Sequence, residues 1–290
     1  MSISRQNLSI VIVTLKSSKV IHQCIESIDD NIPIIVVENS NDEKFKNNLE
    51  LKYKNLKCVL SKSNIGFGAG NNIGINLSKT DYVLILNPDT ILDADALNQI
   101  FLTSKKISEF SILAPISSDN NYPNYGMLNK KKVEKTNPFF RVDHVDGYAM
   151  LLNKKKFKNN FYFDDNFFLY LENTDLCLRV KRNGGGIYVI SNAKIKHRGA
   201  STLDEKNKEE VELSRNWHWC WSKFYFNKKN YGFFRTLREC LLIYASAIIK
   251  YLFYSLINNN YKKKIYFNRA SGFYNAFLGK SSSYRPKLKD

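Results

Sequence analysis

Apolar and polar positions alternate in a regular way along the first 115 residues. Short segments that contain an apolar run stand at 8–15, 32–40, 56–64 and 81–90, and the first of them is continuous and rich in β-branched residues. Each run is followed by apolar residues at helical spacing, by a polar helical stretch or by a glycine-rich stretch. Strands that are buried on both faces read as continuous apolar runs. The pattern therefore predicts an α/β fold with a mostly parallel sheet and helices on both faces.

Polar side chains stand where these predicted strands end. In open parallel sheets, ligands bind outside the carboxyl ends of the strands, near the point where the strand order reverses. The residues at the expected strand exits are Thr14, Glu38, Asn39, Asn64 and Asp89. Their shared position predicts a ligand site at this edge of the sheet.

The glycine-rich segment 64–74, NIGFGAGNNIG, follows the third predicted strand. Glycine lets a backbone bend tightly and approach a ligand without Cβ clashes. The segment lacks the Gly-Lys-Ser/Thr of a phosphate-binding P-loop, and the first unit lacks the glycines of a dinucleotide fingerprint. Taken alone, it fits a ligand loop and an ordinary loop-to-helix turn equally well.

The formal net charge of +17 changes the range of partners to consider. It favours an anionic partner, such as nucleic acid, a phosphorylated small molecule or an acidic membrane surface, although a Lys- and Asn-rich genome gives the same bias. The chain has no zinc-finger spacing, no basic region with heptads and no aromatic RNA-binding motif, so we expect no nucleic-acid partner.

Cysteine spacing and the amino terminus predict the compartment. The five cysteines are scattered, with no Cys-x-x-Cys pair, which favours a reducing, cytoplasmic location. The first apolar run, of about eight residues, is too short for a signal peptide and predicts the first strand instead. Residues 117–144 show no clear period and predict a long polar loop that serves as a lid, binds the acceptor or is disordered.

The carboxyl-terminal region is aromatic, basic and apolar. Its apolar run Leu241–Ile257, interrupted by Lys250, is marginal for a membrane span. A helix lying on the anionic inner face of the cytoplasmic membrane fits better, because cations flank the run. These are Lys228, Lys229, Arg235, Arg238 and Lys262 to Lys264. The alternative is a helical hairpin packed on the domain or across a dimer.

Several blocks, in this order, resemble the family-2 glycosyltransferases of the GT-A fold, especially the rhamnosyltransferase-like branch. The blocks are SIVIVTL, VVENS, NIGFGAGNNIG, LNPDT, VDGYAMLLNKKKF and FDDNFFLYLENTDLCLRVKRNGGGIYVISNAKIKHRGAST. The resemblance covers roughly residues 8–230. It implies a GT-A-like, Rossmann-type catalytic domain over 1–230 that binds a nucleotide sugar, followed by a helical region over 231–290.

The resemblance also implies roles for single residues. Asn87-Pro88-Asp89 resembles the family's Asp-x-Asp variant, in which Asp89 binds Mg²⁺ or Mn²⁺ against the donor diphosphate. His197 would complete the metal site or contact the diphosphate, and Arg198 would contact phosphate. Thr14 and Glu38, where the family usually has Asp, would lie near the nucleoside. Asn64, Gly66 and Asn71 would line the nucleotide and diphosphate pocket, and Asn39 would also bind the donor.

The expected catalytic base lies in YLENTDLCLR, residues 170–179. The resemblance implies an inverting transfer, in which one carboxylate accepts the proton of the acceptor hydroxyl. The position that often holds this base is Asn173, whose amide cannot accept a proton. Glu172 is therefore the first choice and Asp175 the second. Both acids also fit a plain role as negative charges at a helix amino terminus.

The implied function is transfer of a hexosyl or deoxyhexosyl group from a nucleoside-diphosphate sugar. The acceptor would be the hydroxyl of a glycan or of a polyprenyl-linked sugar, in cell-surface polysaccharide synthesis. The alternative is a catalytically degenerate paralogue that binds nucleotide or membrane without turnover, and Asn173 is its best evidence.

Overall fold

The computed structural model describes residues 2–127, 137–199 and 205–288. The chain forms two compact units, which we call the sheet unit and the helical unit. The sheet unit comprises Met1–Asp164 and Asn173–Thr202, and the helical unit comprises Asp165–Glu172 and Leu203–Asp290. The expected division of function after residue 230 stays a prediction.

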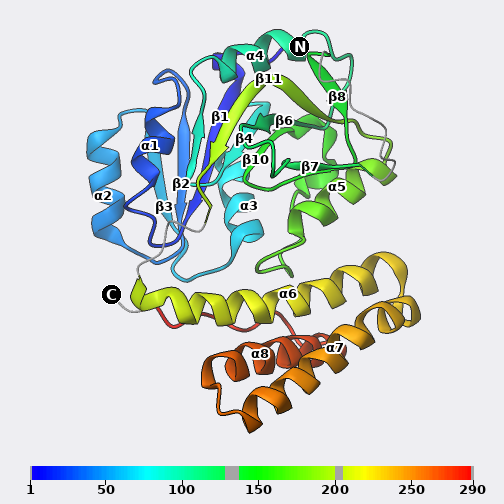
Figure 1. The fold of residues 1–290 in the computed structure, drawn as a ribbon. Helices are drawn as coiled ribbons and strands as arrows, with labels where there is room; N and C mark the ends of the chain where they lie inside the picture. The colour runs from blue at the N-terminus through cyan, green and yellow to red at the C-terminus, as the bar shows by residue number, and fades with distance from the viewer. Residues whose placement is uncertain (1, 128–136, 200–204, 289–290) are drawn as a thin grey trace. The chain divides into compact units, whose positions relative to one another are not determined.

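The sheet unit is built around one large mixed sheet (Figure 1). Its strand order is β3-β2-β1-β4-β10-β6-β11-β5, and β8 also pairs with β11. The strands are β1 (Leu8–Thr14), β2 (Ile34–Glu38), β3 (Leu56–Leu60), β4 (Tyr82–Leu86), β5 (Thr90–Leu92), β6 (Ile112–Ser117), β8 (Phe139–Arg141), β10 (Ala149–Asn153) and β11 (Ile187–His197).

The half of the sheet formed by the first four predicted strands is parallel. β1 lies between β2 and β4, so the strand order reverses at β1. β10 then runs antiparallel between β4 and β6, while β6 and β11 are parallel. The predicted α/β class is confirmed. The direction of β10 is a detail that its apolar sequence could not reveal, because a continuous apolar run reads the same in either orientation.

Helices cover both faces of this sheet (Figure 1). On β1, Ile10 and Ile12 point to the face of α1 and α4, whereas Val11 points to the face of α3 and α5. This follows from the period of two along a strand. The helices of the sheet unit are α1 (Ile21–Glu26), α2 (Glu43–Lys52), α3 (Phe67–Leu77) and α4 (Ala96–Ser104), and α5 (Glu172–Arg182) begins on the last residue of a helical-unit segment.

The glycine-rich segment forms the turn into α3 and the first part of that helix. Gly66 precedes the helix with a φ of 92°, a left-handed conformation that suits glycine. A Cβ on Gly74 would lie 2.4 Å from Val11 Cγ1, and a Cβ on Gly70 would lie 2.9 Å from Val13 Cγ1. The glycines therefore let α3 pack directly on β1.

The predicted loop 117–144 is partly ordered into short strands. β7 (Tyr125–Gly126) pairs with β9 (His144–Val145), and β8 joins the main sheet through β11. These pairings are long-range, so a local search for period does not detect them. Residues 128–136 of this segment lie outside the described residues.

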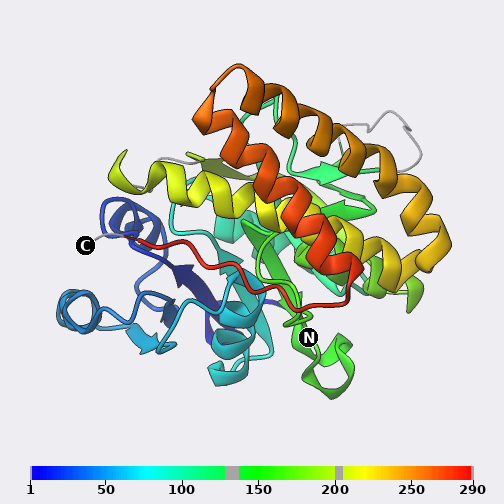
Figure 2. The ribbon, with the colours of Figure 1, turned by 90° about the horizontal axis from the view of Figure 1, so that it is seen from below.

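The helical unit contains three long helices, which confirms the predicted helical carboxyl-terminal region. They are α6 (Lys208–Tyr231), α7 (Phe233–Leu256) and α8 (Asn260–Phe277). Figure 2 shows α7 and α8 side by side as a hairpin, with α8 crossing α6. Trp217, Trp221, Phe224 and Phe273 form its core. At the crossing, a Cβ on Gly272 would lie 2.2 Å from Trp217 O, so glycine permits the close approach.

One face of α7 packs within the helical unit and the other is exposed. Thr236, Cys240 and Ala247 are buried on the inner face. The outer face carries large apolar side chains that are 51% to 83% exposed, namely Leu241, Leu242, Ile249, Leu252, Phe253 and Leu256. We call these six residues the α7 stripe. The helix is long and apolar enough to cross a membrane. Only 11% of its most apolar 18-residue stretch is buried.

Close packing of α3 on β1 gives the first testable prediction. We expect Gly74→Ala to lower the free energy of unfolding by about 1–3 kcal/mol, because the added methyl overlaps buried Val11. Urea denaturation would measure the loss. Val11→Ala is the matched partner: the double variant should lose less than the sum of the two single variants. Simple additivity would show that the overlap is not the cause.

Candidate functional site

The exit of β4 is a tightly held turn. Asn87 O accepts hydrogen bonds from Thr90 N at 3.2 Å, from Thr90 Oγ1 at 2.7 Å and from Cys24 Sγ at 3.4 Å. Asn87 N donates to Tyr148 O of the neighbouring β9–β10 connection at 2.9 Å. Pro88 within the turn is buried and its φ is fixed by its ring. The turn therefore presents Asp89 in one defined place.

Asp89 faces His197 at this turn. His197 Nε2 lies 3.4 Å from Asp89 Oδ1, and the two side chains are 30% and 7% exposed, respectively. The pairing of His197 with Thr90, between β11 and β5, brings them together. The imidazole also stacks on Tyr148, with ring centroids 4.2 Å apart. Arg198 is exposed, and its backbone N–H donates to Asp89 O at 3.0 Å.

The donor atoms of this pair fit a hard divalent cation. Among the described residues, no group of three or more His, Cys, Asp and Glu side chains could hold a metal. Mg²⁺ and Mn²⁺, however, are often bound by one or two protein ligands together with substrate phosphates and water. A buried carboxylate beside an imidazole suits that incomplete kind of site. A ligand phosphate would have to complete it.

A second cluster of predicted residues surrounds the exit of β1. Asn39 N donates to Thr14 O at 2.8 Å, and Asn39 Nδ2 donates to Gly66 O at 3.1 Å. Asn64 Oδ1 accepts from Gly66 N at 3.2 Å. Thr14 Oγ1, Asn39 Oδ1 and Asn71 Oδ1 are buried and have no hydrogen-bond partner among the described residues. Such atoms are costly to leave unpaired, so this cluster is a candidate place for a polar ligand.

The two clusters share one edge of the sheet. β1 and β4 are parallel neighbours, with Ile12 paired to Leu86. Thr14 and Pro88 each lie two residues beyond that pair, so the exits of the two strands are adjacent. This is the point where the strand order reverses.

Glu38 is used by its own loop. Its carboxylate accepts hydrogen bonds from the backbone N–H groups of Ser40 and Asp42 at 2.9 Å, and it also bonds the Ser40 hydroxyl. The side chain is buried, and Glu38 is 1% exposed. Glu38 therefore shapes the turn after β2, and its contact with a nucleoside stays a prediction.

Glu172 is a buried acid with an unsatisfied oxygen. It begins α5, is 6% exposed, and its Oε2 has no hydrogen-bond partner among the described residues. Burial raises the pKa of Glu172 to about 7. The two residues before it, Tyr170 and Leu171, have φ values of 71° and 66°. Side-chain-bearing residues rarely adopt this conformation, and it is often found at functional sites.

Asp175 is buried in a different way. Its Oδ2 accepts from Arg179 Nε at 3.0 Å, and Arg179 also donates to the backbone carbonyl of Tyr162. Asn173 Nδ2 donates to Val145 O at 3.0 Å. Asp175 is thus held in an ion pair and Asn173 in a backbone contact, whereas no described residue forms a hydrogen bond with Glu172 Oε2.

Three residues at the β4 exit were missed by sequence reasoning. Cys24 Sγ donates to Asn87 O, and Tyr148 stacks on His197. Asp146 interacts electrostatically with His144 and His197. Burial raises the pKa of Asp146, while the two histidines lower it. The sequence signal was the polar pair Asp146-Gly147 ahead of the apolar run of β10, which mirrors the polar turn after β4.

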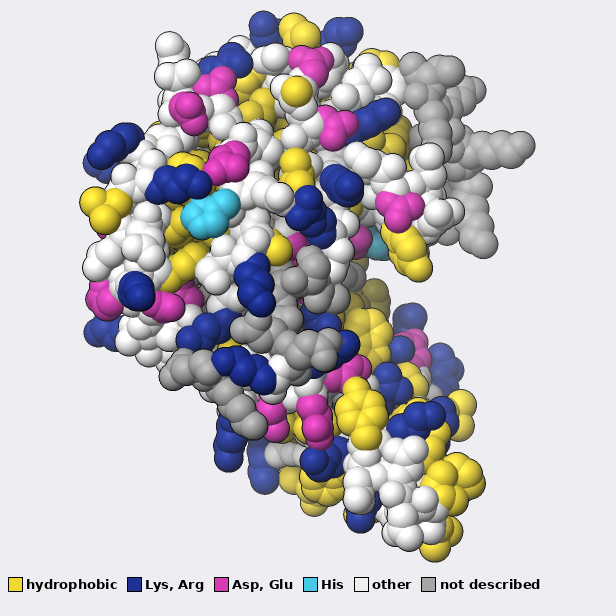
Figure 3. Space-filling model, turned by 60° about the vertical axis from the view of Figure 1, so that its left-hand side comes forward, with side chains coloured by type: hydrophobic (Ala, Val, Ile, Leu, Met, Phe, Trp, Pro, Cys, Tyr) yellow, Lys and Arg dark blue, Asp and Glu magenta, His cyan; other side chains and the backbone are white. Residues whose placement is uncertain are grey.

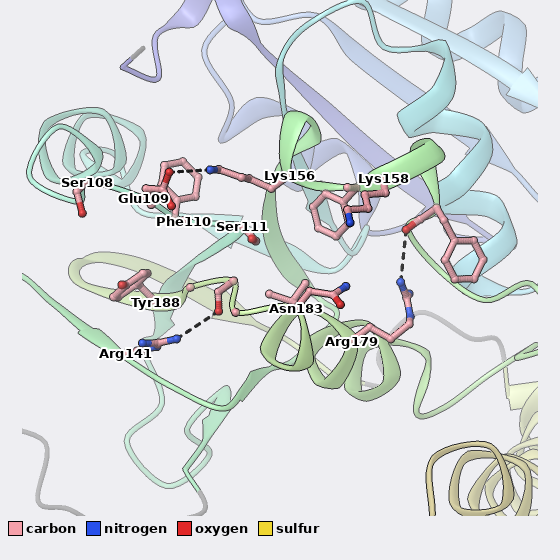
Figure 4. A pocket seen from close by; sticks show the side chains of 16 residues that line it. Ser108, Glu109, Phe110, Ser111, Arg141, Lys156, Lys158, Arg179, Asn183 and Tyr188 are labelled. Carbon is pink, nitrogen blue, oxygen red and sulfur yellow. Dashed lines mark hydrogen bonds and ion pairs between the residues drawn. The ribbon is translucent and has the colours of Figure 1, made fainter.

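A separate cavity of about 590 Å³ lies elsewhere in the sheet unit (Figure 4). None of the sequence-predicted site residues lines it. Three of its cations already have partners: Lys156 pairs with Glu109 at 3.0 Å, and Arg141 and Arg179 donate to backbone carbonyls. The cavity is therefore distinct from the cluster at the strand exits.

Comparison with known proteins shows related sequences. The chain is 26% identical over 194 residues to the low-salt glycan biosynthesis hexosyltransferase Agl10 of Haloferax volcanii, covering 61% of this chain and 62% of that protein. The chain thus spans less than two thirds of this relative. It is 28% identical over 210 residues to the rhamnosyltransferase WbbL of Escherichia coli, covering 62% of this chain and 79% of that protein.

A solved structure and a family model place the fold and the family. The mannosyltransferase PcManGT from Pyrobaculum calidifontis, solved with GDP-Man and Mn²⁺, superposes with a TM-score of 0.56 at 9% identity, over 95% of this chain and 88% of that one. This likeness confirms the expected GT-A-like fold. The model of glycosyl transferase family 2 matches residues 9–170, more than half of the chain. The chain belongs to glycosyl transferase family 2.

Proposed function

We propose that this protein transfers a hexosyl or deoxyhexosyl group from a nucleoside-diphosphate sugar. The acceptor is the hydroxyl of a glycan or of a polyprenyl-linked sugar, in cell-surface polysaccharide synthesis. One observation carries the proposal: the Asp89–His197 pair adjoins buried, unsatisfied polar atoms at the switch point of the sheet. The relatives named as hexosyltransferase and rhamnosyltransferase support the substrate class.

The strand-exit cluster binds the donor. Thr14, Asn39 and Asn71 satisfy their unpaired oxygens on the nucleotide, while Asn64 and Gly66 shape the loop around the diphosphate. Asp89 and His197 hold Mg²⁺ or Mn²⁺ and Arg198 contacts phosphate. When bound, the cation neutralises negative charge on the nucleoside diphosphate. The Mn²⁺ in the mannosyltransferase structure supports this assignment.

Glu172 is the base of an inverting transfer. A base must take the proton of the acceptor hydroxyl, and a carboxylate whose pKa lies near the working pH does this best. Glu172 meets this condition because burial raises its pKa to about 7. Asp175 is the weaker candidate because its carboxylate is engaged by Arg179. Asn173 donates to a backbone carbonyl and cannot replace either acid.

The α7 stripe binds the anionic inner leaflet of the cytoplasmic membrane. Six large apolar side chains are exposed along one face of α7, and cations flank them in the sequence. On the side of the molecule drawn in Figure 3, exposed hydrophobic side chains lie among Lys and Arg side chains. The nearest cations in sequence are Arg235, Arg238, Lys250, Lys262 and Lys263. An anionic lipid surface matches this combination of apolar face and positive charge. A dimer interface is the competing use of the same face.

A second candidate function is nucleotide or membrane binding without turnover. Asn173 at the position that often holds the base favours it. An assay of sugar transfer distinguishes the two functions. An enzyme transfers the sugar and loses this activity when Glu172 is changed, whereas a protein that only binds nucleotide or membrane transfers none.

The donor site predicts metal-dependent nucleotide binding. UDP, GDP, dTDP, CMP and ATP, each with and without Mn²⁺, would be compared by thermal shift. One nucleoside diphosphate should stabilise the protein only with Mn²⁺, by about 2.7 kcal/mol at a hundredfold excess over its Kd. Asp89→Asn should abolish this shift. Asp93→Asn, an exposed aspartate of the same stretch, is the matched control and should retain it.

The two buried acids predict opposite effects on activity and stability. Because the base acts when ionised, wild-type kcat/KM should rise tenfold per pH unit up to about pH 7 and then level off. Glu172→Gln should lower kcat by about 10²–10⁴-fold. At pH 8 it should keep or raise the free energy of unfolding, because burial disfavours the ionised Glu172 that glutamine replaces.

Asp175→Asn is the matched variant for this test. It should lower the free energy of unfolding by about 2 kcal/mol, because Arg179 loses a charged acceptor, while the pH profile stays unchanged. The reverse pattern, with the pH profile lost in Asp175→Asn and kept in Glu172→Gln, would make Asp175 the base.

The α7 stripe predicts binding to anionic vesicles. Leu252→Glu combined with Leu256→Glu should reduce co-sedimentation with phosphatidylglycerol vesicles at least tenfold, because two charges enter the apolar face. Leu51→Glu, which changes a leucine of the sheet unit that is 75% exposed, should bind like the wild type. A concentration-dependent dimer that the double variant disrupts, without vesicle binding by the wild type, would assign the stripe to a second copy instead.

A further inference from the structure

The segment Asp165–Glu172 carries the proposed base into α5 and is itself strained. We call it the approach segment. Tyr170 and Leu171, the last two residues before Glu172, both have left-handed backbone conformations. Two such residues in succession persist only when their surroundings hold them in place. The contacts that hold the approach segment therefore decide where Glu172 lies.

The approach segment lies along α6 of the same unit. Ser222 Oγ donates to Leu169 O at 2.8 Å. The ring of Tyr170 meets the edge of Trp219, with centroids 5.6 Å apart, and Phe167 meets Tyr225 at 4.9 Å. These contacts anchor the segment, but each of them involves only α6 as the partner.

Phe168 is held by more than α6. Its ring is buried and stacks on the His218 ring, with centroids 4.4 Å apart. The Arg285 guanidinium carbon lies 3.8 Å from the centroid of the same ring. A guanidinium over an aromatic face is an attractive cation–π contact. Phe168 thus ties the approach segment to a residue more than a hundred positions later in the chain.

Arg285 belongs to residues 280–288, which follow α8 and which we call the carboxyl-terminal strap (Figure 2). Trp221 Nε1 donates to Lys280 O at 3.0 Å, and His218 Nε2 lies 2.8 Å from Tyr284 O. Ser282 Oγ lies 2.9 Å from His218 Nδ1. Since a carbonyl can only accept, Nε2 carries the proton, and Nδ1 accepts from the Ser282 hydroxyl.

The neutral form of His218 therefore holds the strap through these two hydrogen bonds. Burial lowers the pKa of His218 to about 4, and the nearby Arg285 charge acts in the same direction. His218 and Arg285 both contact the ring of Phe168. The strap and α6 together fix a side chain four residues before Glu172.

We propose that Arg285 is a positioning residue for the catalytic base. Through Phe168 it holds the approach segment in the strained conformation that sets Glu172 at the start of α5. This inference rests on the proposed role of Glu172. It adds to that role a requirement for the strap, which lies outside the residues matched by the family model.

The test compares three strap variants in the full chain. Arg285→Ala should lower kcat ten- to hundredfold, because a displacement of about 1 Å at a catalytic group has an effect of that size, while the KM for the donor changes less than twofold. Arg285→Lys should recover part of kcat because it keeps a cation over the ring. Lys287→Ala, an exposed cation of the same strap, is the matched control and should behave like the wild type.

The pH profile separates positioning from a general loss of stability. In Arg285→Ala the midpoint of the kcat profile should move below about 7, because a loosened Glu172 is better hydrated and ionises more easily. Phe168→Leu, which removes the ring, should give the same shift and provides the test if Arg285→Ala does not fold. An unchanged kcat and an unchanged midpoint in both variants would overturn the inference.

Glu172→Gln, measured beside these variants, separates this inference from the proposed function. Loss of transfer in Glu172→Gln, with wild-type kcat and midpoint in Arg285→Ala, overturns the positioning role alone. Full transfer activity in Glu172→Gln overturns the proposed base, whatever the strap variants show.

Discussion

The parallel pairing of β1 with β4 is the constraint on which the proposed donor site depends. β2 and β3 follow β1 on one side of the sheet, and β4 pairs with β1 on the other side. Two strand exits that are far apart in sequence thereby become adjacent. Thr14 stands at one exit and Asp89 just beyond the other. The later pairing of β11 with β5 brings His197 to Asp89.

Four of the buried acids of this protein are accommodated by different means. The carboxylate of Glu38 is held by backbone N–H groups of its own loop, and that of Asp175 by Arg179. Asp89 faces an imidazole. Of these four, only Glu172 has a buried oxygen without a hydrogen-bond partner in the part of the chain that the structure describes, and burial is the main cause of its raised pKa. A carboxyl group kept in this state can change its protonation near neutral pH.

Sequence reasoning predicted most of what depends on local pattern. The strands that carry Thr14, Glu38 and Asp89 were visible because they are continuous apolar runs that end in polar residues. The antiparallel direction of β10, the stacking of Tyr148 on His197 and the Cys24 bond to the β4 turn were not visible. Each depends on partners distant in sequence, and the sequence pattern around Cys24 or Tyr148 is that of an ordinary buried residue.

The same limit applies more strongly at α5. The pattern showed two acids near a helix start, but burial and hydrogen bonding distinguish them, and both depend on tertiary packing. The left-handed residues Tyr170 and Leu171 have no sequence signal, since glycine is absent from both positions. Such strain and an unpaired buried oxygen both oppose folding, so the packing of aromatic residues on α6 must offset them. That these unfavourable features meet at Glu172 argues that the segment is shaped for a function rather than for stability.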